Sequence, residues 1–201
     1  MAFVWARYLL TKVKASFADS VKRLERGEIR ERDLFNTTLR KVMRERLTYK
    51  YLIKGDEMTP TFASEGENVL VRSITTPSAR SVFVSDVVML RHPTDPSRKL
   101  VRRVAAVEGD EMLSSNEQDE PFKLGKGHCW VLCDNPSINA KEAQDSRTFG
   151  PLAVSNIEGR VIYFRRSTVD HGPVLNSDEA MEEDSAVLAM ELDVDELSGQ
   201  S

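Results

Sequence analysis

Cysteine and histidine, whose side chains are suited to nucleophilic or metal chemistry, are few in this chain. There are two cysteines, Cys129 and Cys133, and three histidines, His92, His128 and His171. Nothing in the sequence places a histidine beside a serine, so a Ser-His-Asp triad is not expected. There is no second Cys/His pair at the spacing of zinc ligands. The sequence therefore predicts no metal site and no cofactor.

The two cysteines lie in a segment rich in strand-forming residues. In a strand they would be about 13 Å apart, since each residue advances the chain by about 3.3 Å. A disulfide between them is then impossible without a bend. We expect both to be small buried residues, which is the usual role of free cysteine.

Five motifs occur in order between residues 52 and 165. They read GDEMTPTF at 55–62, EGENVLV at 65–71, SDVV at 85–88, LVRRV at 100–104 followed by EGD at 108–110, and GHCWVLCDN at 127–135 followed by DSRTFGP at 145–151 and GR at 159–160. Together they resemble the motifs of the type I signal peptidases, serine proteases that include the mitochondrial inner membrane peptidases. The resemblance implies a mainly β fold with an antiparallel, signal-peptidase-like core.

The resemblance places the catalytic positions of that family on different residue types. The nucleophilic serine corresponds to Glu57, the general-base lysine to Arg102, and a residue that donates an oxyanion hydroxyl to Gly55. Arginine keeps its proton because its pKa stays above about 12. A carboxylate is a poor nucleophile toward an amide. We therefore expect no catalysis by a Ser-Lys dyad.

Glu57 and Arg102 carry opposite charges at positions that touch in this family. We therefore predict an ion pair across the former cleft, with a carboxylate oxygen within about 4 Å of a guanidinium nitrogen. The alternative is that both side chains turn to solvent, as most Glu and Arg side chains do.

Other motif residues are implied to support the loops around these positions. We expect the Asp145–Arg147 stretch to brace one loop by hydrogen bonds and an ion pair. The predicted supporting residues are Met58, Pro60, Arg103, Asp134, Asn135, Asp145, Ser146 and Arg147.

A β domain over residues 52–174 must position these side chains. Short β-branched or aromatic runs alternate there with glycine and proline turn formers. The runs are 69–71, 82–84, 87–90, 101–107, 130–132 and 161–164. Many short strands without intervening helices favour an antiparallel sheet, a sandwich or an open barrel.

Residues 1–51 are predicted to form a basic helical arm. An apolar stripe at helical spacing predicts a first helix, and a second helical stretch runs toward Tyr51. Residues 1–18 contain three basic residues and no acidic one, which is typical of a mitochondrial or plastid transit segment. The alternative is a surface helix that packs on its own domain or on a partner. The stripe consists of Phe3, Ala6, Leu10, Val13, Phe17, Val21 and Leu24.

Charge is distributed unevenly along the chain. Residues 1–46 contain 12 Lys and Arg against 6 Asp and Glu, whereas residues 175–201 contain 9 Asp and Glu and no Lys or Arg. We expect the acidic segment 175–201 to be a disordered or weakly helical tail. The basic arm and the acidic tail then bind either different partners or each other.

The whole composition limits the possible functions. There is no run of about 18 apolar residues, so a transmembrane helix is not expected. The β domain has no excess of basic residues, which argues against nucleic-acid binding.

We expect a catalytically inactive relative of the peptidases that acts as a binding or assembly subunit. Its partners would be protein subunits, either of an organellar complex or of an active processing peptidase. Residues 1–18 would make any membrane contact, which would be peripheral. The expected location is the mitochondrion, at the inner membrane or in the matrix, with the plastid as the alternative. The alternative function is a leader-peptide-processing serine endopeptidase, or its non-catalytic subunit, at the mitochondrial inner membrane.

Overall fold

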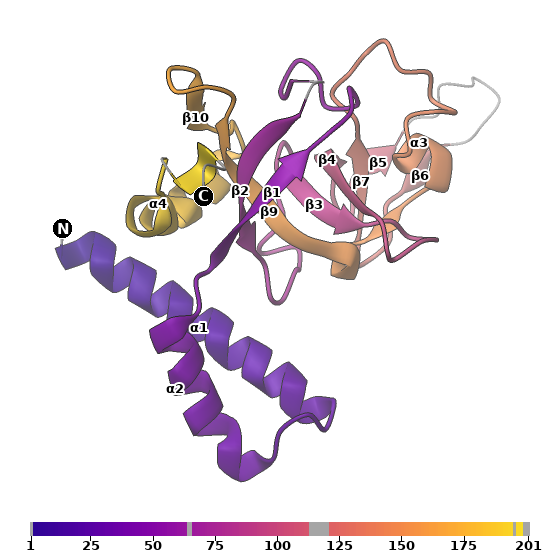
Figure 1. The fold of residues 1–201 in the computed structure, drawn as a ribbon. Helices are drawn as coiled ribbons and strands as arrows, with labels where there is room; N and C mark the ends of the chain where they lie inside the picture. The colour runs from indigo at the N-terminus through magenta and orange to yellow at the C-terminus, as the bar shows by residue number, and fades with distance from the viewer. Residues whose placement is uncertain (1, 64–65, 113–120, 195, 199–201) are drawn as a thin grey trace.

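A computed structural model of the chain describes residues 2–63, 66–112, 121–194 and 196–198. The fold is a curled antiparallel sheet with a hairpin of two helices on one side and a further helix near the C-terminus (Figure 1). The predicted mainly β, antiparallel core with a helical N-terminal extension is thereby confirmed.

The chain forms helices, 3₁₀ turns and strands over the following ranges. The helices are α1 (Ala2–Glu25), α2 (Leu34–Arg44), α3 (Ser146–Phe149) and α4 (Asp178–Glu191), with 3₁₀ turns η1 (Glu31–Asp33), η2 (Val154–Asn156) and η3 (Glu196–Ser198). The strands are β1 (Thr48–Ile53), β2 (Glu67–Ser73), β3 (Val87–Arg91), β4 (Lys99–Ala106), β5 (Glu111–Met112), β6 (Phe122–Lys123), β7 (His128–Leu132), β8 (Leu152–Ala153), β9 (Ile157–Arg165) and β10 (His171–Pro173).

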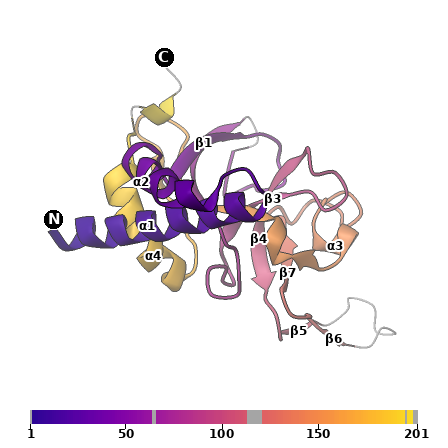
Figure 2. The same cartoon turned by 90° about the horizontal axis from the view of Figure 1, so that it is seen from below.

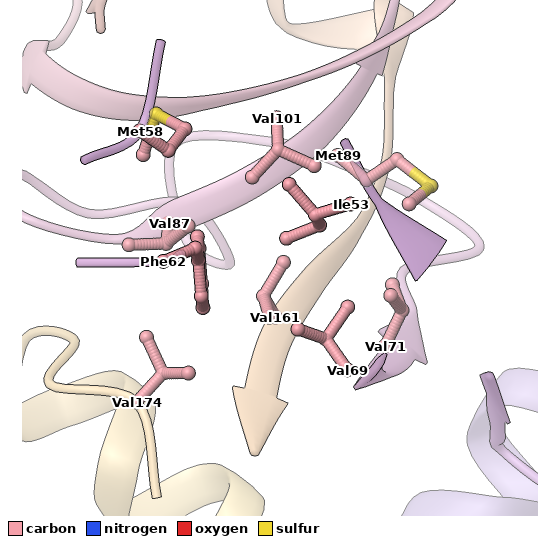
Figure 3. Close-up of a cluster of buried hydrophobic side chains, with 10 residues drawn as sticks. All are labelled: Ile53, Met58, Phe62, Val69, Val71, Val87, Met89, Val101, Val161 and Val174. Atoms are coloured by element: carbon pink, nitrogen blue, oxygen red, sulfur yellow. The ribbon is translucent and has the colours of Figure 1, made fainter. Parts of the chain in front are cut away.

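The main sheet has the strand order β1-β2-β9-β3-β4-β7-β8, and β10 pairs with β9 outside this path. The strand β3 is buried on both faces because alternate side chains point to opposite sides of a strand. Val87 and Met89 join one hydrophobic cluster, and Val88 and Leu90 join another. Figure 3 shows the first cluster, which also receives Phe62 from the first motif.

The strands β2 and β9 approach each other closely where their register shifts. The shift falls between Leu70 and Val71. A Cβ atom on Gly159 would collide with the backbone oxygen of Arg72 and lie 2.7 Å from Val71 Cγ1. Only glycine therefore fits this position without a backbone shift.

One predicted strand is wrong. Residues 82–84 form part of a turn that precedes β3. The Phe83 amide donates to the Asp86 carboxylate at 3.0 Å, and Ser85 has a φ of 78°, so the chain reverses before β3 begins. Val82 is nevertheless buried in the second hydrophobic cluster.

The N-terminal arm contains the two predicted helices, but the second is shorter than expected. The helix α2 ends at Arg44, and the next residues enter the sheet as β1, so the predicted boundary at residue 51 falls inside a strand. Lys41 joins α2 to α1 through an ion pair with Asp19 at 2.9 Å. Figure 2 shows α1 passing beside α4 on one side of the β domain.

Of the two expectations for the acidic segment 175–201, the helical one holds for Asp178–Glu191, which form α4. Ser177 caps this helix by accepting a hydrogen bond from the Ala180 amide, and Ala186 and Val187 are buried. Two acidic residues of α4, Glu183 and Asp184, have basic partners in the sheet. Composition alone left disorder open because those partners lie more than 20 residues earlier in the chain.

The basic partners are Arg160 and Arg72 of the sheet. Arg160 is fully buried, and its guanidinium contacts Asp184 at 2.8 Å and Asp86 at 2.7 Å. Burial opposes the charge, but these two carboxylates raise the pKa of Arg160 above its usual value. Arg72 pairs with the same Asp184. The helix α4 is thus attached to the sheet by desolvated ion pairs.

Candidate functional site

The first motif forms a fixed loop between β1 and β2. Met58 and Phe62 are buried in the hydrophobic core, and this packing fixes the loop against the sheet. The Asn135 amide donates to the Glu57 carbonyl at 3.0 Å, and the Asn135 side chain donates to the Asp56 carbonyl at 2.8 Å. The backbone of Glu57 is therefore held between the core and the loop after β7. Pro60 of the same motif is exposed and follows a cis peptide bond.

The side chain of Glu57 folds back over Gly55. A Cβ atom on Gly55 would collide with Oε2 of Glu57, and Gly55 has a φ of 98°. A serine at position 55 is thus incompatible with this position of the Glu57 carboxylate. The carboxylate occupies the space that an oxyanion-donating side chain would need.

Arg102 lies on β4 and is buried, with 2% of its surface exposed. Its guanidinium donates to the carbonyls of Ala143 at 3.0 Å, Gln144 at 3.2 Å and Val101 at 2.6 Å. Burial lowers the pKa of Arg102 from its usual value, and the negative charge on Glu57 acts in the opposite direction. Arg102 remains a donor with its hydrogen bonds directed at backbone oxygens.

The predicted ion pair between Glu57 and Arg102 is wrong. Both residues are described, and no oxygen of Glu57 lies within 4.0 Å of a guanidinium nitrogen of Arg102. The donors of Arg102 are directed at backbone carbonyls, and the Glu57 carboxylate lies over Gly55. The two charges influence each other only at longer range. The solvent alternative fails for Arg102 as well, because this side chain is buried.

Arg103 points to the other side of β4 and joins several loops. It forms a bidentate contact with Asp134, at 2.9 and 2.7 Å, and it donates to the carbonyls of Ser85 and Leu175. Thr61 of the first motif donates to the same carboxylate at 2.5 Å. This network connects the first motif to the loop after β7.

The Asp145–Arg147 stretch forms the start of α3 and lies against β7. Asp145 is buried and accepts hydrogen bonds from the Cys133 amide at 2.9 Å and from the Arg147 guanidinium at 2.7 Å. The Ser146 hydroxyl accepts from the Val131 amide at 2.9 Å. Although burial opposes it, hydrogen bonds from Arg147 and Cys133 lower the pKa of the Asp145 carboxyl below its usual value.

Some contact residues of this site were not singled out from the sequence. Thr61, Ala143 and Gln144 all bind motif residues. Thr61 lies inside the first motif, so its position was a usable signal. Ala143 and Gln144 contribute only backbone carbonyls to Arg102, and no side-chain pattern reveals such a role.

Alternative catalytic groups do not come together in the described part of the chain. The ring nitrogens of His92, His128 and His171 hydrogen-bond to Thr94, the Lys126 carbonyl and Tyr163 respectively. Cys129 and Cys133 are both free thiols. Burial and the nearby Asp145 raise the pKa of Cys133, which disfavours its thiolate. Among the described residues, no group of three His, Cys, Asp or Glu side chains could hold a metal ion.

The chain is similar in sequence to proteases of mitochondria. Residues 34–118 match the family described as "Signal peptidase, peptidase S26". The chain is 45% identical over 194 residues to the Mitochondrial ATP-independent inner membrane protease subunit 2 of Arabidopsis thaliana, which covers 96% of this chain and 95% of the relative.

Two further relatives are subunits numbered 1. The chain is 30% identical to the Mitochondrial ATP-independent inner membrane protease subunit 1a of Arabidopsis thaliana, over 58% of this chain and 72% of the relative. It is also 30% identical to the Mitochondrial inner membrane protease subunit 1 of Schizosaccharomyces pombe, over 55% of this chain and 69% of the relative. The predicted mitochondrial location agrees with these names. The chain therefore belongs to the signal peptidase family, peptidase S26, and is a homologue of mitochondrial inner membrane protease subunits.

Proposed function

We propose that this protein is a non-catalytic subunit of a mitochondrial inner membrane protease assembly. One observation carries the proposal: the position of the general base holds a buried arginine whose donors are all used on backbone carbonyls. Arg102 is buried with its donors on backbone carbonyls, and the Glu57 carboxylate lies over Gly55. An arginine cannot accept a proton from a nucleophile. The histidines and cysteines that the structure describes make other contacts or stay protonated, so none of them is proposed as a substitute base.

The remaining site residues would then preserve the shape of the former cleft for binding. Met58 anchors the first motif, and Arg103 with Asp134 ties it to the loop after β7. Such contacts support backbone position rather than bond cleavage, so they can persist after catalysis is lost. Pro60, Asn135 and the stretch Asp145–Arg147 complete this support.

The proposed location is the mitochondrion, at the inner membrane. Residues 1–18 contain basic residues without acidic ones, and the relatives are named mitochondrial inner membrane protease subunits. Because those relatives are named as subunits, the proposed partner is another protease subunit.

A peptidase assay tests the proposal directly. The purified chain is incubated with leader peptides beside a Glu57→Ser, Arg102→Lys double variant and a Glu57→Ala variant. We expect no cleavage by the unmodified chain. Cleavage that disappears in Glu57→Ala would overturn the proposal, whereas cleavage that persists in this variant points to a contaminating protease.

The alternative function is a processing peptidase that cleaves leader sequences, and the word protease in the names of the relatives favours it. Capture of partners from mitochondria separates the two functions. Recovery of a subunit with an intact Ser-Lys dyad, together with an inactive purified chain, supports the non-catalytic role. Cleavage by the purified chain that disappears in Glu57→Ala supports the alternative.

A further inference from the structure

Arg165, the last residue of β9, is a buried cation without a counter-charge among the described residues. Only 9% of its surface is exposed. Its Nε and Nη1 atoms are buried without a hydrogen-bond partner, and its guanidinium forms no ion pair within the described part of the chain. A charge taken out of water is costly unless a partner of opposite charge compensates it. Arg165 therefore differs from an ordinary structural arginine.

The neighbouring arginines show the ordinary arrangement. Arg160 of the same strand has two carboxylates at 2.7 and 2.8 Å. Arg166, the next residue in the chain, pairs with Glu67 at 3.3 Å and with Asp170 at 2.8 Å. The acidic residues at the start of β2 and in the turn before β10 are thus engaged by Arg166, and Arg165 has no such contact.

The register of the sheet places Arg165 in a row of side chains on one face. Residues directly opposite each other on antiparallel strands share a face. Arg165 lies opposite Asn68 of β2 and opposite His171 of β10, and Asn68 lies opposite Leu52 of β1. We call these four residues the Arg165 row. The row crosses four strands, with Arg165 inside it.

The Arg165 row lies on the sheet face opposite the first motif. Neighbours along a strand point to opposite faces, and Phe164 packs against the cluster that contains Phe62 of the first motif. Tyr163, which shares the face of Arg165, packs with Leu197 beneath the C-terminal turn η3. A partner bound at the row would approach from the side away from the first motif. Figure 1 shows the β9–β10 hairpin, which carries the row, above α4.

Polar and apolar groups surround Arg165 on this face. Asn68 is half-buried, and its side chain forms no hydrogen bond with a residue that the structure describes. Leu52 is 44% exposed at one end of the row, and Val169, in the turn between β9 and β10, is 91% exposed. An arginine between exposed apolar side chains has the composition of a protein interface.

We infer that Arg165 binds a carboxylate of a partner protein, in a segment where apolar side chains flank the acidic residue. The planar guanidinium matches a carboxylate in charge and in geometry. A dianionic phosphate fits the charge less well, because Lys50 on this face pairs with Glu196 at 3.4 Å and Arg166 is also engaged. The inference deepens the proposed role as a subunit, on which it rests, by naming a contact surface.

Replacement of Arg165 tests whether the chain itself needs this charge. Arg165→Met keeps an unbranched side chain and removes the charge. We expect its midpoint of urea unfolding to equal or exceed that of the unmodified chain, because a buried charge without a partner opposes folding. Arg160→Met, which leaves its carboxylates unpaired, should unfold at a lower urea concentration. A destabilised Arg165→Met would show that the chain or bound water already satisfies Arg165, and would overturn the inference.

A peptide titration of the full chain tests binding. The probe is a capped heptapeptide with a central glutamate and a leucine three residues away on each side. Three extended residues span about 10 Å, which is the width of two strand spacings and thus the separation of Leu52 and Arg165 in the row. In the matched peptide, glutamine replaces the glutamate.

The Nε–Hε resonance of Arg165 reports the contact in an isotope-labelled chain, and its absence in Arg165→Met assigns it. We expect the glutamate peptide to shift this resonance with a dissociation constant on the order of 1 mM, since a short flexible peptide loses freedom on binding. The glutamine peptide should bind at least about ten-fold more weakly, because it lacks the charge-assisted hydrogen bonds.

Variants locate the binding site. Broadening of the leucine methyl signals of the glutamate peptide measures its binding to each variant. Arg165→Met should bind at least about ten-fold more weakly than the unmodified chain, and Leu52→Ser with Val169→Ser should also weaken binding. Arg80→Met, at an exposed position outside the row, should bind as the unmodified chain does. Circular dichroism confirms that each variant is folded.

Three binding results would overturn the inference. One is equal binding of the glutamate and glutamine peptides, or no binding of either. Another is equal loss of binding in Arg80→Met and Arg165→Met. The third is a shift of the Arg165 resonance by inorganic phosphate but not by the glutamate peptide, because the site would then hold a phosphate. The peptidase assay decides separately whether the chain is catalytic, so failure of this site and failure of the proposed function are distinguishable.

Discussion

Arg102 is a buried cation whose donors reach backbone carbonyls. Replacing it with methionine leaves the carbonyls of Ala143 and Gln144 without this partner in a buried region. We expect Arg102→Met to lower the free energy of unfolding by about 3 kcal/mol, since hydrogen bonds to charged groups and unsatisfied buried polar groups both contribute. Urea unfolding followed by circular dichroism measures the change. The control is Lys99→Met, an exposed position on the same strand.

Glu57 should matter little for stability because it does not pair with Arg102. Its carboxylate is only half-buried and interacts with the guanidinium at long range. We therefore expect Glu57→Ala to change the free energy of unfolding by less than about 1 kcal/mol. A loss as large as that of Arg102→Met would mean that the two charges are coupled more closely than their separation allows.

Asp145 makes part of the stability depend on pH. Its folded pKa is lowered, so the unfolded chain binds a proton at higher pH than the folded chain does. The contribution of Asp145 to the free energy of unfolding is complete above the usual aspartate pKa of about 3.9. It is lost as the pH falls through the lower pKa that Asp145 has in the folded protein. Asp145→Asn should therefore be less stable than the unmodified protein at neutral pH, and the difference should shrink in acid. Urea unfolding at several pH values measures this, with exposed Asp178→Asn as the control.

At the scale of elements, α4 depends on Asp184. This carboxylate contacts the fully buried Arg160 at 2.8 Å and also pairs with Arg72. Asp184→Ala removes one of the carboxylates that neutralise the buried Arg160 guanidinium. We therefore expect a loss of about 3–5 kcal/mol in the free energy of unfolding. Glu179→Ala, at an exposed position of the same helix, should have little effect. Equal effects of the two changes would show that α4 is held by its apolar side alone.

The strands were predictable from the sequence where local pattern decides the structure. Residues 69–71, 87–90 and 161–164 are β-branched or aromatic runs, and each lies in a strand. The run at 82–84 has the same composition, but a hydrogen bond that the Asp86 carboxylate accepts from the Phe83 amide turns the chain there. The sequence left the segment of α4 open between disorder and a weak helix, because the basic residues that pair with Asp184 lie far away in the chain.

The site was predictable only in part. Sequence motifs indicated which residues support the first motif, and Arg103 and Asp134 do meet beside it. The partners of Arg102 could not be predicted, because backbone carbonyls leave no mark in the sequence. Complementary charge suggested a pair with Glu57. Charge alone, however, does not determine whether a buried guanidinium donates its hydrogen bonds to a carboxylate or to backbone carbonyls.

At the scale of the whole molecule, the basic arm and the acidic C-terminal segment bind each other. Glu191 at the end of α4 is buried and accepts hydrogen bonds from the amides of Leu47 and Thr48 and from the Tyr8 hydroxyl, at 2.9, 2.9 and 2.6 Å. Burial, together with the hydrogen bond to Glu191, raises the pKa of Tyr8. One carboxylate thus connects α1, the start of β1 and α4.

Loss of this carboxylate should loosen the arm without unfolding the sheet. We expect Glu191→Gln to increase the rate of trypsin cleavage within residues 1–46, because a neutral amide is a weaker acceptor for these donors. Limited proteolysis followed by mass spectrometry locates the cuts. Glu179→Gln serves as the control, and equal cleavage of both variants would show that Glu191 does not hold the arm.

The contact of Glu191 with Tyr8 also determines when α1 can dock on α4 during synthesis of the chain. The helix α1 is synthesised first, and its partner follows 183 positions later. A growing chain, or one threading through a translocation pore with its N-terminus ahead, therefore presents α1 before α4 exists to receive it. During that interval α1 lacks this contact, so the arm can reach its final placement only after α4 has emerged.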